Sequence, residues 1–427
     1  MVISQNQSSS QNDHVSFSFL KNYKIALLFG YFQESIYNNV VENSIGGIQN
    51  AADALQKSLV EGIVYLHKET EIINLPYIGS FPKRYRKLFS PTGDFEYTAV
   101  NGNLVKGKNI RFCNLSVYKI FDRYIQAKNA INKWCKKYEN KQKVLLVYAM
   151  HAPFVKACVD VKKEWGTSLK IVLIIPDLPQ FMSSKSSLLY SCAKTITNKL
   201  FNREIPKIDA FVLLSKYMRD LLPISDKPWI VVEGIYDKSN DVENTIYEDV
   251  KTIFYAGTLA KRYGIMNLVK AFVSLQNDDI RLVICGAGDA EKEIKLEALR
   301  DERIIFKGQL PRKEVLRLQR KATLLVNPRT PEGEFTKYSF PSKTMEYLAS
   351  GVPTLLYKLP GIPDEYYEYC YTLEQLGVES LSQKLSIILS SSQQHLRSVG
   401  RKARNFILSQ KNPIKQCEKI MMLIERL

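Results

Sequence analysis

Two side chains of opposite charge, Lys343 and Glu346, lie three residues apart in the stretch "SFPSKTMEYLASGVPTLL". Pro341 suits the first turn of a helix, and Gly351 suits its end. A cation in the first turn opposes the helix dipole and therefore favours a bound anion such as phosphate. A carboxylate one turn later can accept two hydrogen bonds from vicinal sugar hydroxyls. The pair predicts a site that binds the phosphate and ribose of a nucleotide, although an i, i+3 surface ion pair has the same spacing.

The elements around this helix indicate its place in a parallel sheet. Nine short apolar runs alternate with helical patterns, and continuous β-branched runs are typical of parallel strands that are covered on both faces. The runs are "YKIALLFGYF", "KVLLVYAM", "LKIVLIIPDL", "DAFVLLS", "KTIFYAGTL", "IRLVICGAG", "RIIFKGQL", "ATLLVNPR" and "VPTLLYK". We therefore predict an α/β protein with two doubly wound, Rossmann-like domains that face each other across a cleft.

The order of these runs also predicts the domain boundaries. Residues 1–20 are polar and serine-rich, which predicts a disordered tail. An N-terminal domain over 21–234 and a C-terminal domain over 249–410 are joined by a polar linker at 235–248. Residues 411–427 form a predicted amphipathic helix, which we expect to pack back on the N-terminal domain. Within that domain, Val117 to Tyr138 is a predicted helix with Phe121 on its apolar side.

The charge balance is unusual, with 60 Lys and Arg against 43 Asp and Glu, a net charge of +17. Such an excess implies an anionic partner, but no nucleic-acid-binding motif is present. The segment Phe81 to Phe89 mixes four cations with three aromatic residues, which suits an anionic membrane surface, or simply a solvated loop. Scattered cysteines and the lack of a secretory or membrane-spanning run predict a cytoplasmic protein, peripheral at most on the inner face of the membrane. Unclustered histidines argue against a zinc site.

The second half resembles the donor-binding domain of family-4 glycosyltransferases, which are retaining enzymes with the GT-B fold. The matching pieces occur in order: "YAGTLAKRYGI", "LVICGAGD", "IIFKGQLPRKEVLRLQRKATLLVNP" and "SFPSKTMEYLASGVPTL". The similarity extends into the first half through "GGIQNAADAL" and "YAMHAPFVKA". Within that family, the chain resembles bacterial enzymes that build capsular or exopolysaccharide repeat units.

The resemblance implies donor-binding roles for specific residues. Glu346 matches the glutamate that binds the donor ribose, while Tyr338 stands where the family has its other signature glutamate. Thr258 and Tyr263 replace the phosphate-binding arginine and lysine of the family, so neighbouring cations are expected to bind the diphosphate instead. The predicted donor site consists of Gly257, Thr258, Lys261, Arg262, Gly286, Gly288, Gln309, Leu310, Arg329, Ser342, Lys343 and Glu346. Glu334 is a substitute for the missing glutamate.

The predicted acceptor side of the cleft is formed by four residues of the N-terminal domain. Gly46 and Gly47 are expected to follow the first strand and precede a helix, and in the family this loop lies beside donor phosphate and acceptor. His151 follows the strand "KVLLVYAM", and Asp177 follows "LKIVLIIP". A structural histidine and a turn aspartate are the alternative readings of these two residues.

Together these patterns predict a glycosyltransferase that moves a sugar from a nucleotide diphosphate to a lipid-linked or glycan acceptor, and the resemblance alone implies that it is a retaining enzyme. Arg262, Lys343 and His151 are the expected catalytic residues, and no cofactor or metal is expected. A phosphorolytic or epimerising GT-B enzyme and a non-catalytic GT-B partner subunit are the alternatives. The sequence leaves the sugar, the base, the acceptor and the oligomeric state open.

Overall fold

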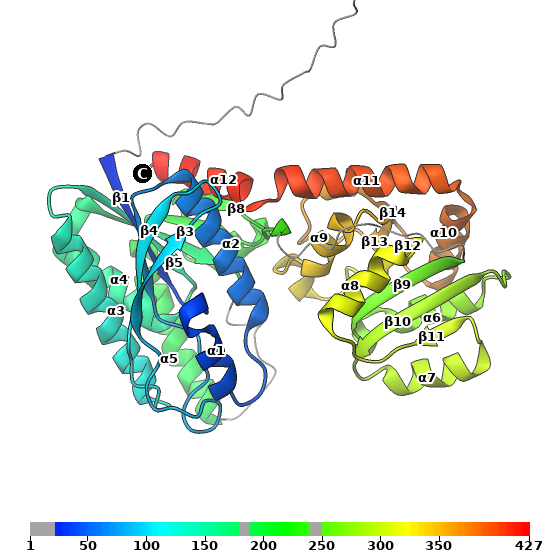
Figure 1. Ribbon diagram of the computed structural model, residues 1–427, viewed down its shortest axis with the longest axis horizontal. Helices are drawn as coiled ribbons and strands as arrows, with labels where there is room; N and C mark the ends of the chain where they lie inside the picture. The colour runs from blue at the N-terminus through cyan, green and yellow to red at the C-terminus, as the bar shows by residue number, and fades with distance from the viewer. Residues whose placement is uncertain (1–21, 179–187, 239–249) are drawn as a thin grey trace, which may run out of the picture.

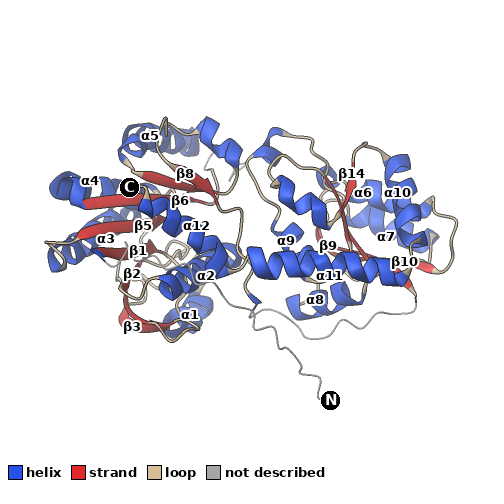
Figure 2. Ribbon diagram, turned by 90° about the horizontal axis from the view of Figure 1, so that it is seen from above, coloured by secondary structure: helices blue, strands red, loops and turns tan. Residues whose placement is uncertain are grey.

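The computed structural model describes residues 22–178, 188–238 and 250–427, and the predicted tail at 1–20 and most of the predicted linker lie outside them. Two α/β domains lie side by side, and helices cover both faces of each sheet (Figures 1 and 2). The prediction of two Rossmann-like domains is confirmed. No helix in the described part of the chain is long and apolar enough to cross a membrane.

The N-terminal domain is built on an eight-stranded sheet in the order β3-β4-β2-β1-β5-β6-β7-β8. Only β3 is antiparallel to its neighbour. The strands are β1 (Tyr23–Phe29), β2 (Thr70–Asn74), β3 (Gly93–Thr98), β4 (Leu104–Asn109), β5 (Gln142–Tyr148), β6 (Leu169–Ile175), β7 (Ala210–Leu213) and β8 (Trp229–Val231). The helices are α1 (Glu34–Asn43), α2 (Asn50–Leu66), α3 (Tyr118–Lys137), α4 (Ala152–Trp165) and α5 (Leu188–Glu204).

Alternation along β1 explains why both faces of this sheet are covered. Ile25, Leu27 and Phe29 point into a core with α2 and α12, whereas Ala26 and Leu28 point into a core with α3 and α4. All five side chains are fully buried. A strand that is apolar on both sides can be stable only between two helical layers.

The C-terminal domain has a six-stranded, fully parallel sheet in the order β11-β10-β9-β12-β13-β14. The strands are β9 (Lys251–Thr258), β10 (Ile280–Ala287), β11 (Ile304–Phe306), β12 (Leu324–Asn327), β13 (Thr354–Tyr357) and β14 (Tyr371–Leu373). The helices are α6 (Ile265–Val273), α7 (Glu291–Arg300), α8 (Arg312–Lys321), α9 (Ser342–Ala349), α10 (Val378–Ser390), α11 (Gln393–Gln410) and α12 (Pro413–Glu425).

The chain returns to the N-terminal domain through its last helix. Figure 1 shows α11 lying along the C-terminal domain and α12 continuing over the N-terminal domain. Asn412 caps α12 by accepting a hydrogen bond from the Lys415 backbone N–H, and Pro413 occupies the first turn. The helix packs against α2, where Gly62 leaves room for the Pro413 backbone, 2.2 Å from where a Cβ would lie.

A buried ion pair ties together the two places where the chain passes between domains. The Nζ of Lys411, which precedes α12, lies 2.5 Å from Glu233, which follows β8, and 2.6 Å from Glu365. Tyr366 donates a hydrogen bond to Glu233, and the Lys411 carbonyl accepts one from the Tyr236 backbone. Lys411 and Glu233 are both buried, so Glu233 depends on Lys411 for its charge to be compensated, while Lys411 also has Glu365.

We expect Lys411→Met to lower the free energy of unfolding by about 3–5 kcal/mol, because it leaves Glu233 buried without its cation. Lys415→Met is the matched control, since Lys415 pairs with Glu418 on the surface of α12 and should cost less than about 1 kcal/mol. Chemical denaturation of the two variants measures the difference. Equal losses would show that the buried pair contributes no more than a surface one.

Candidate functional site

The candidate donor site lies at the carboxyl edge of the C-terminal sheet, where α9 begins. Figure 1 shows α9 on the side of its domain nearest the N-terminal domain. The Tyr347 hydroxyl fixes α9 to the sheet by accepting a hydrogen bond from the Ala256 backbone N–H at 3.0 Å. The helix ends at Ala349, and Gly351 follows with a φ of +81°, a conformation that favours glycine.

Lys343, in the first turn of α9, extends over the end of β9. A Cβ on Gly257 would lie 2.6 Å from the Lys343 Cε and 2.9 Å from the Tyr255 hydroxyl. Burial lowers the pKa of Lys343 below its usual value. Within the described residues, its ammonium forms no hydrogen bond or ion pair. A partly buried cation without a partner, at the N-terminus of a helix, is suited to bind an anion.

Arg329, just after β12, brings a second cation to the same edge of the sheet. Its guanidinium donates a hydrogen bond to Ser339 Oγ at 3.2 Å and lies 4.8 Å from the Phe335 ring centroid and 5.2 Å from that of Tyr263. Burial lowers its pKa, and its Nε has no partner. The aromatic rings hold the guanidinium in place without neutralising its charge.

The two other predicted cations of this region lie in different environments. Arg262 is exposed, and its guanidinium lies 4.9 Å from the ring centroid of the next residue, Tyr263. The exposed Lys261 instead pairs with Glu293 of α7, so its ammonium is already engaged. Other predicted donor-site residues lie near the end of β9, after β11 and at the start of α9. Three of them are exposed, Thr258, Gln309 and Ser342, and two are partly buried, Gly257 and Leu310.

Glu346 is partly buried, one turn along α9 from Lys343. Its carboxylate accepts a hydrogen bond from Arg312, the first residue of α8, at 3.1 Å. The i, i+3 pair with Lys343, which the spacing allowed, is therefore not the contact found. The sequence interpretation missed Arg312, although its position directly after "GQLP" was a usable signal.

The glycines at the carboxyl end of β10, Gly286 within the strand and Gly288 just after it, allow two backbone segments to approach each other closely. A Cβ on Gly286, whose φ is +136°, would lie 1.8 Å from the Gly257 carbonyl oxygen, and one on Gly288 would lie 2.4 Å from that of Leu259. These contacts bring the ends of β9 and β10 close together. The structure thus gives both glycines a packing role that is independent of any ligand.

The loop with Gly46 and Gly47 does not follow the first strand directly, although the sequence predicts that it does. The helix α1 lies between β1 and this loop, which leads into α2. Gly46 has a φ of +91°, and the Arg84 guanidinium lies 3.5 Å from where its Cβ would be. Asp177 is exposed, two residues beyond β6.

His151 precedes α4 and is enclosed by aromatic rings. The ring centroids of Phe154 and Tyr77 lie 5.0 and 5.5 Å from that of His151, both in edge-on geometry, and the Nδ1 atom is buried without a partner. Burial lowers its pKa well below the usual value, and the nearby Arg123 and Lys119 lower it further. His151 is therefore neutral near pH 7 and cannot contribute positive charge.

Contacts between the domains place the loop before α9 against the N-terminal domain. Ser215 Oγ donates a hydrogen bond to the Lys337 carbonyl at 2.6 Å, and Tyr338 is buried within the N-terminal core. Tyr338 occupies the position of the missing signature glutamate and serves here in packing. Among the described residues, no hydrogen bond or ion pair joins Gly46, Gly47, His151 or Asp177 to the donor-site cations.

Comparisons with known proteins agree with this geometry. Residues 237–406 match the family model "Glycosyl transferases group 1". The matched residues span β9 to most of α11 and so cover nearly all of the predicted donor-binding domain. A search of curated proteins by sequence gives no match.

Solved structures with the same fold cover almost the whole chain. A sucrose-phosphate synthase from Thermosynechococcus elongatus is 13% identical, with a TM-score of 0.59, over 94% of this chain and 98% of its own. The lipopolysaccharide outer core galactosyltransferase WaaB in its apo form is 12% identical, with a TM-score of 0.57, over 95% and 100%. HepE from Anabaena in complex with UDP is 11% identical, with a TM-score of 0.55, over 95% and 100%. The fold is GT-B.

Gly257→Ala should displace the Lys343 side chain, because the new methyl group would overlap its Cε. We expect the affinity for a nucleoside diphosphate to fall about tenfold or more, the loss that follows from weakening a charge-assisted bond. Calorimetry with UDP and GDP measures this. Gly47→Ala is the control, since no atom lies within 4 Å of its added Cβ. Undiminished affinity in Gly257→Ala would remove Lys343 from the site.

Proposed function

We propose that the protein transfers a sugar from a nucleotide diphosphate to a lipid-linked or glycan acceptor, because residues 237–406 match the model of the glycosyl transferases group 1. The observation that carries the proposal is the unpartnered ammonium of Lys343 over Gly257, at the start of α9. The UDP held by HepE, a protein of the same fold, supports a nucleoside diphosphate as the ligand.

Two residues of α9 bind different parts of the donor. Lys343 and the free backbone N–H groups at the helix start bind the diphosphate, and Arg329 approaches it from the end of β12. Glu346, held by Arg312, accepts hydrogen bonds from the ribose hydroxyls. Arg262 is exposed and can turn toward the diphosphate, whereas Lys261 would first have to leave Glu293.

Departure of the diphosphate is the step that these cations assist. As the bond between the sugar and the diphosphate breaks, negative charge grows on the leaving oxygen, and Lys343 and Arg329 stabilise it electrostatically. The acceptor hydroxyl then attacks from the same face of the sugar and gives its proton to the departing diphosphate oxygen, so that the configuration is retained. His151, being neutral, is assigned to the acceptor side, where its ring borders the end of β5.

We assign the acceptor side to the Gly46–Gly47 loop, His151 and Asp177. A lipid-linked acceptor would place the enzyme at the cytoplasmic face of the membrane, in the synthesis of a surface polysaccharide. The rival is a non-catalytic subunit with the same fold, which the uncharged Thr258 and Tyr263 would suit.

A panel of nucleotide sugars tests the proposal directly. A bound donor raises the unfolding temperature by mass action, so thermal shifts identify the base and the sugar. Slow hydrolysis of the stabilising donor by the purified protein distinguishes the enzyme from the non-catalytic subunit. Stabilisation without hydrolysis or transfer would favour the rival, and no stabilisation by any nucleotide would refute the donor site.

Lys343→Met should lower turnover more than donor affinity, because the charge on the diphosphate grows in the transition state. Lys261→Met is the matched control and should have little effect, since that ammonium pairs with Glu293. Steady-state kinetics of donor hydrolysis give both constants. A higher Michaelis constant at unchanged turnover would make Lys343 a ground-state ligand only.

Glu346→Ala should weaken nucleotide binding about ten- to a hundredfold, the value of a lost charge-assisted hydrogen bond. Arg312→Ala should have a smaller effect, because it removes only the contact that orients Glu346. Calorimetry with ribonucleotides and 2′,3′-dideoxynucleotides provides the specific readout. If Glu346→Ala loses no more affinity for the ribose form than for the dideoxy form, Glu346 does not bind the ribose.

A further inference from the structure

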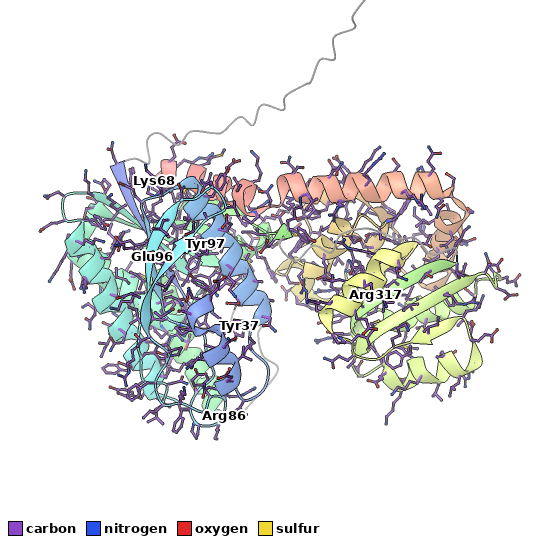
Figure 3. The ribbon with its side chains drawn as sticks, in the orientation of Figure 1. Tyr37, Lys68, Arg86, Glu96, Tyr97 and Arg317 are labelled. Carbon is purple, nitrogen blue, oxygen red and sulfur yellow. The ribbon has the colours of Figure 1, made fainter. Side chains whose placement is uncertain are left out.

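A basic and apolar surface, which we call the docking face, lies at the end of the N-terminal domain. It consists of residues 81–89 and 111–121, and Figure 3 shows Arg86 at the lower end of this domain. The two segments lie side by side, because Phe89 forms an antiparallel bridge with Cys113 and the Asn114 backbone donates to the Leu88 carbonyl at 2.6 Å. They therefore form one continuous surface.

Large apolar side chains are exposed across the docking face. The first turn of α3 lies beyond the core, so that Val117 is 82% and Phe121 is 56% exposed. This differs from the sequence interpretation, which placed Phe121 on the buried side of the helix. The exposed apolar side chains are Leu88, Phe89, Leu115, Val117, Tyr118, Ile120 and Phe121. A contiguous apolar surface of this kind marks an interaction site.

The same surface carries an excess of positive charge. Residues 81–93 and 110–121 contain no Asp or Glu. Five cations on these segments are exposed, namely Lys83, Arg84, Arg86, Lys87 and Arg111. The Arg111 guanidinium lies 4.1 Å from the ring centroid of Phe89, so cationic and apolar groups are interleaved rather than separated.

The docking face is held in a fixed shape by buried side chains beneath it. Tyr85 is fully buried and donates a hydrogen bond to Asn39 of α1, so it is not available to enter a membrane, unlike the exposed Leu88 and Phe89 of the same segment. Asp122 accepts a hydrogen bond from the Cys113 backbone, and Arg123 donates to the carbonyls of Leu75 and Pro76. The exposed apolar groups are thus presented on a rigid support.

We propose that the docking face binds an anionic phospholipid membrane. Cations interleaved with exposed aliphatic and aromatic side chains fit headgroups and the underlying acyl chains together. A symmetric dimer through this face would bring the five cations of one copy against those of the other. Nucleic acid would leave the aliphatic side chains uncovered. The docking does not depend on the donor chemistry of the C-terminal domain.

The docking face adjoins the candidate acceptor loop. The Ile45 backbone donates to the Arg84 carbonyl at 3.0 Å, Ser44 forms a bridge with Tyr85, and Arg84 extends over Gly46. A membrane bound at this face would bring a lipid-linked acceptor to the Gly46–Gly47 loop. This last step rests on the proposed function, whereas membrane binding itself can be measured without it.

Co-sedimentation of the full-length protein with vesicles tests the docking face. The vesicles contain phosphatidylcholine alone or mixed with phosphatidylglycerol. We expect binding to the mixed vesicles that weakens as salt shortens the Debye length from about 10 Å at 0.1 M to about 3 Å at 1 M. The charge variant is Lys83→Ser, Arg86→Ser and Lys87→Ser combined, and the apolar variant is Val117→Ser, Ile120→Ser and Phe121→Ser combined.

Matched controls remove the same numbers of exposed side chains from the C-terminal domain. The charge control combines Lys292→Ser, Arg401→Ser and Lys402→Ser, and the apolar control combines Leu296→Ser, Leu299→Ser and Ile387→Ser; all six side chains are exposed. The charge variant should bind mixed vesicles about a hundredfold more weakly, since each cation near an anionic surface contributes roughly a fivefold gain. The apolar variant should also bind more weakly, and the controls should bind as the unaltered protein does.

Equal binding to both kinds of vesicle, or equal binding by variants and controls, would overturn the proposal. So would sedimentation analysis that finds a dimer which the apolar variant dissociates, because the face would then be a protein interface. Thermal stabilisation by nucleotide sugars should be the same in the docking variants and their controls. Loss of membrane binding with intact donor binding therefore separates failure of the docking face from failure of the donor site.

Discussion

The buried pair of Lys411 and Glu233 is the constraint on which the arrangement of the two domains depends. Glu233 lies where the chain leaves the N-terminal domain, and Lys411 lies where the chain comes back. Both charges are taken out of water, and Lys411 is the cation that compensates Glu233, so moving one crossing without the other would carry a large electrostatic cost. The helix α9 and the loop before it are thereby kept beside the N-terminal domain, where Ser215 bonds to Lys337.

The donor site shows the opposite arrangement of charge. Burial lowers the pKa values of Lys343 and Arg329, and neither side chain pairs with a carboxylate in the described chain. Tyr255 lies next to Lys343 and within the electrostatic reach of Arg329, and burial raises its own pKa to about 12. The protein thus keeps two cations partly removed from water. An incoming dianion would offset the free-energy cost of their desolvation, and perturbed pKa values of this kind are common at functional sites.

The sequence predicts what is local and misses what depends on distant partners. All nine apolar runs are strands, whereas the sequence analysis missed β2, β3, β4, β8 and β14, because these strands have at most six residues and most of them are interrupted by polar side chains. The position of Lys343 at the start of a helix follows from Pro341 and Gly351 nearby. The contacts of Glu346 with Arg312 and of Lys261 with Glu293 join residues more than thirty positions apart, and no local pattern encodes them.

The return of α12 to the N-terminal domain has a consequence for biosynthesis. One core of that domain includes Ile420, Met421, Leu423 and Ile424, packed with residues of α2. A ribosome must therefore synthesise the chain through α12 before the first domain can close, while the second domain can fold as soon as α11 has emerged. Until α12 has emerged, the apolar side of α2 is uncovered in the nascent chain. We therefore expect chaperones to recognise this helix, and chains that terminate before α12 to aggregate.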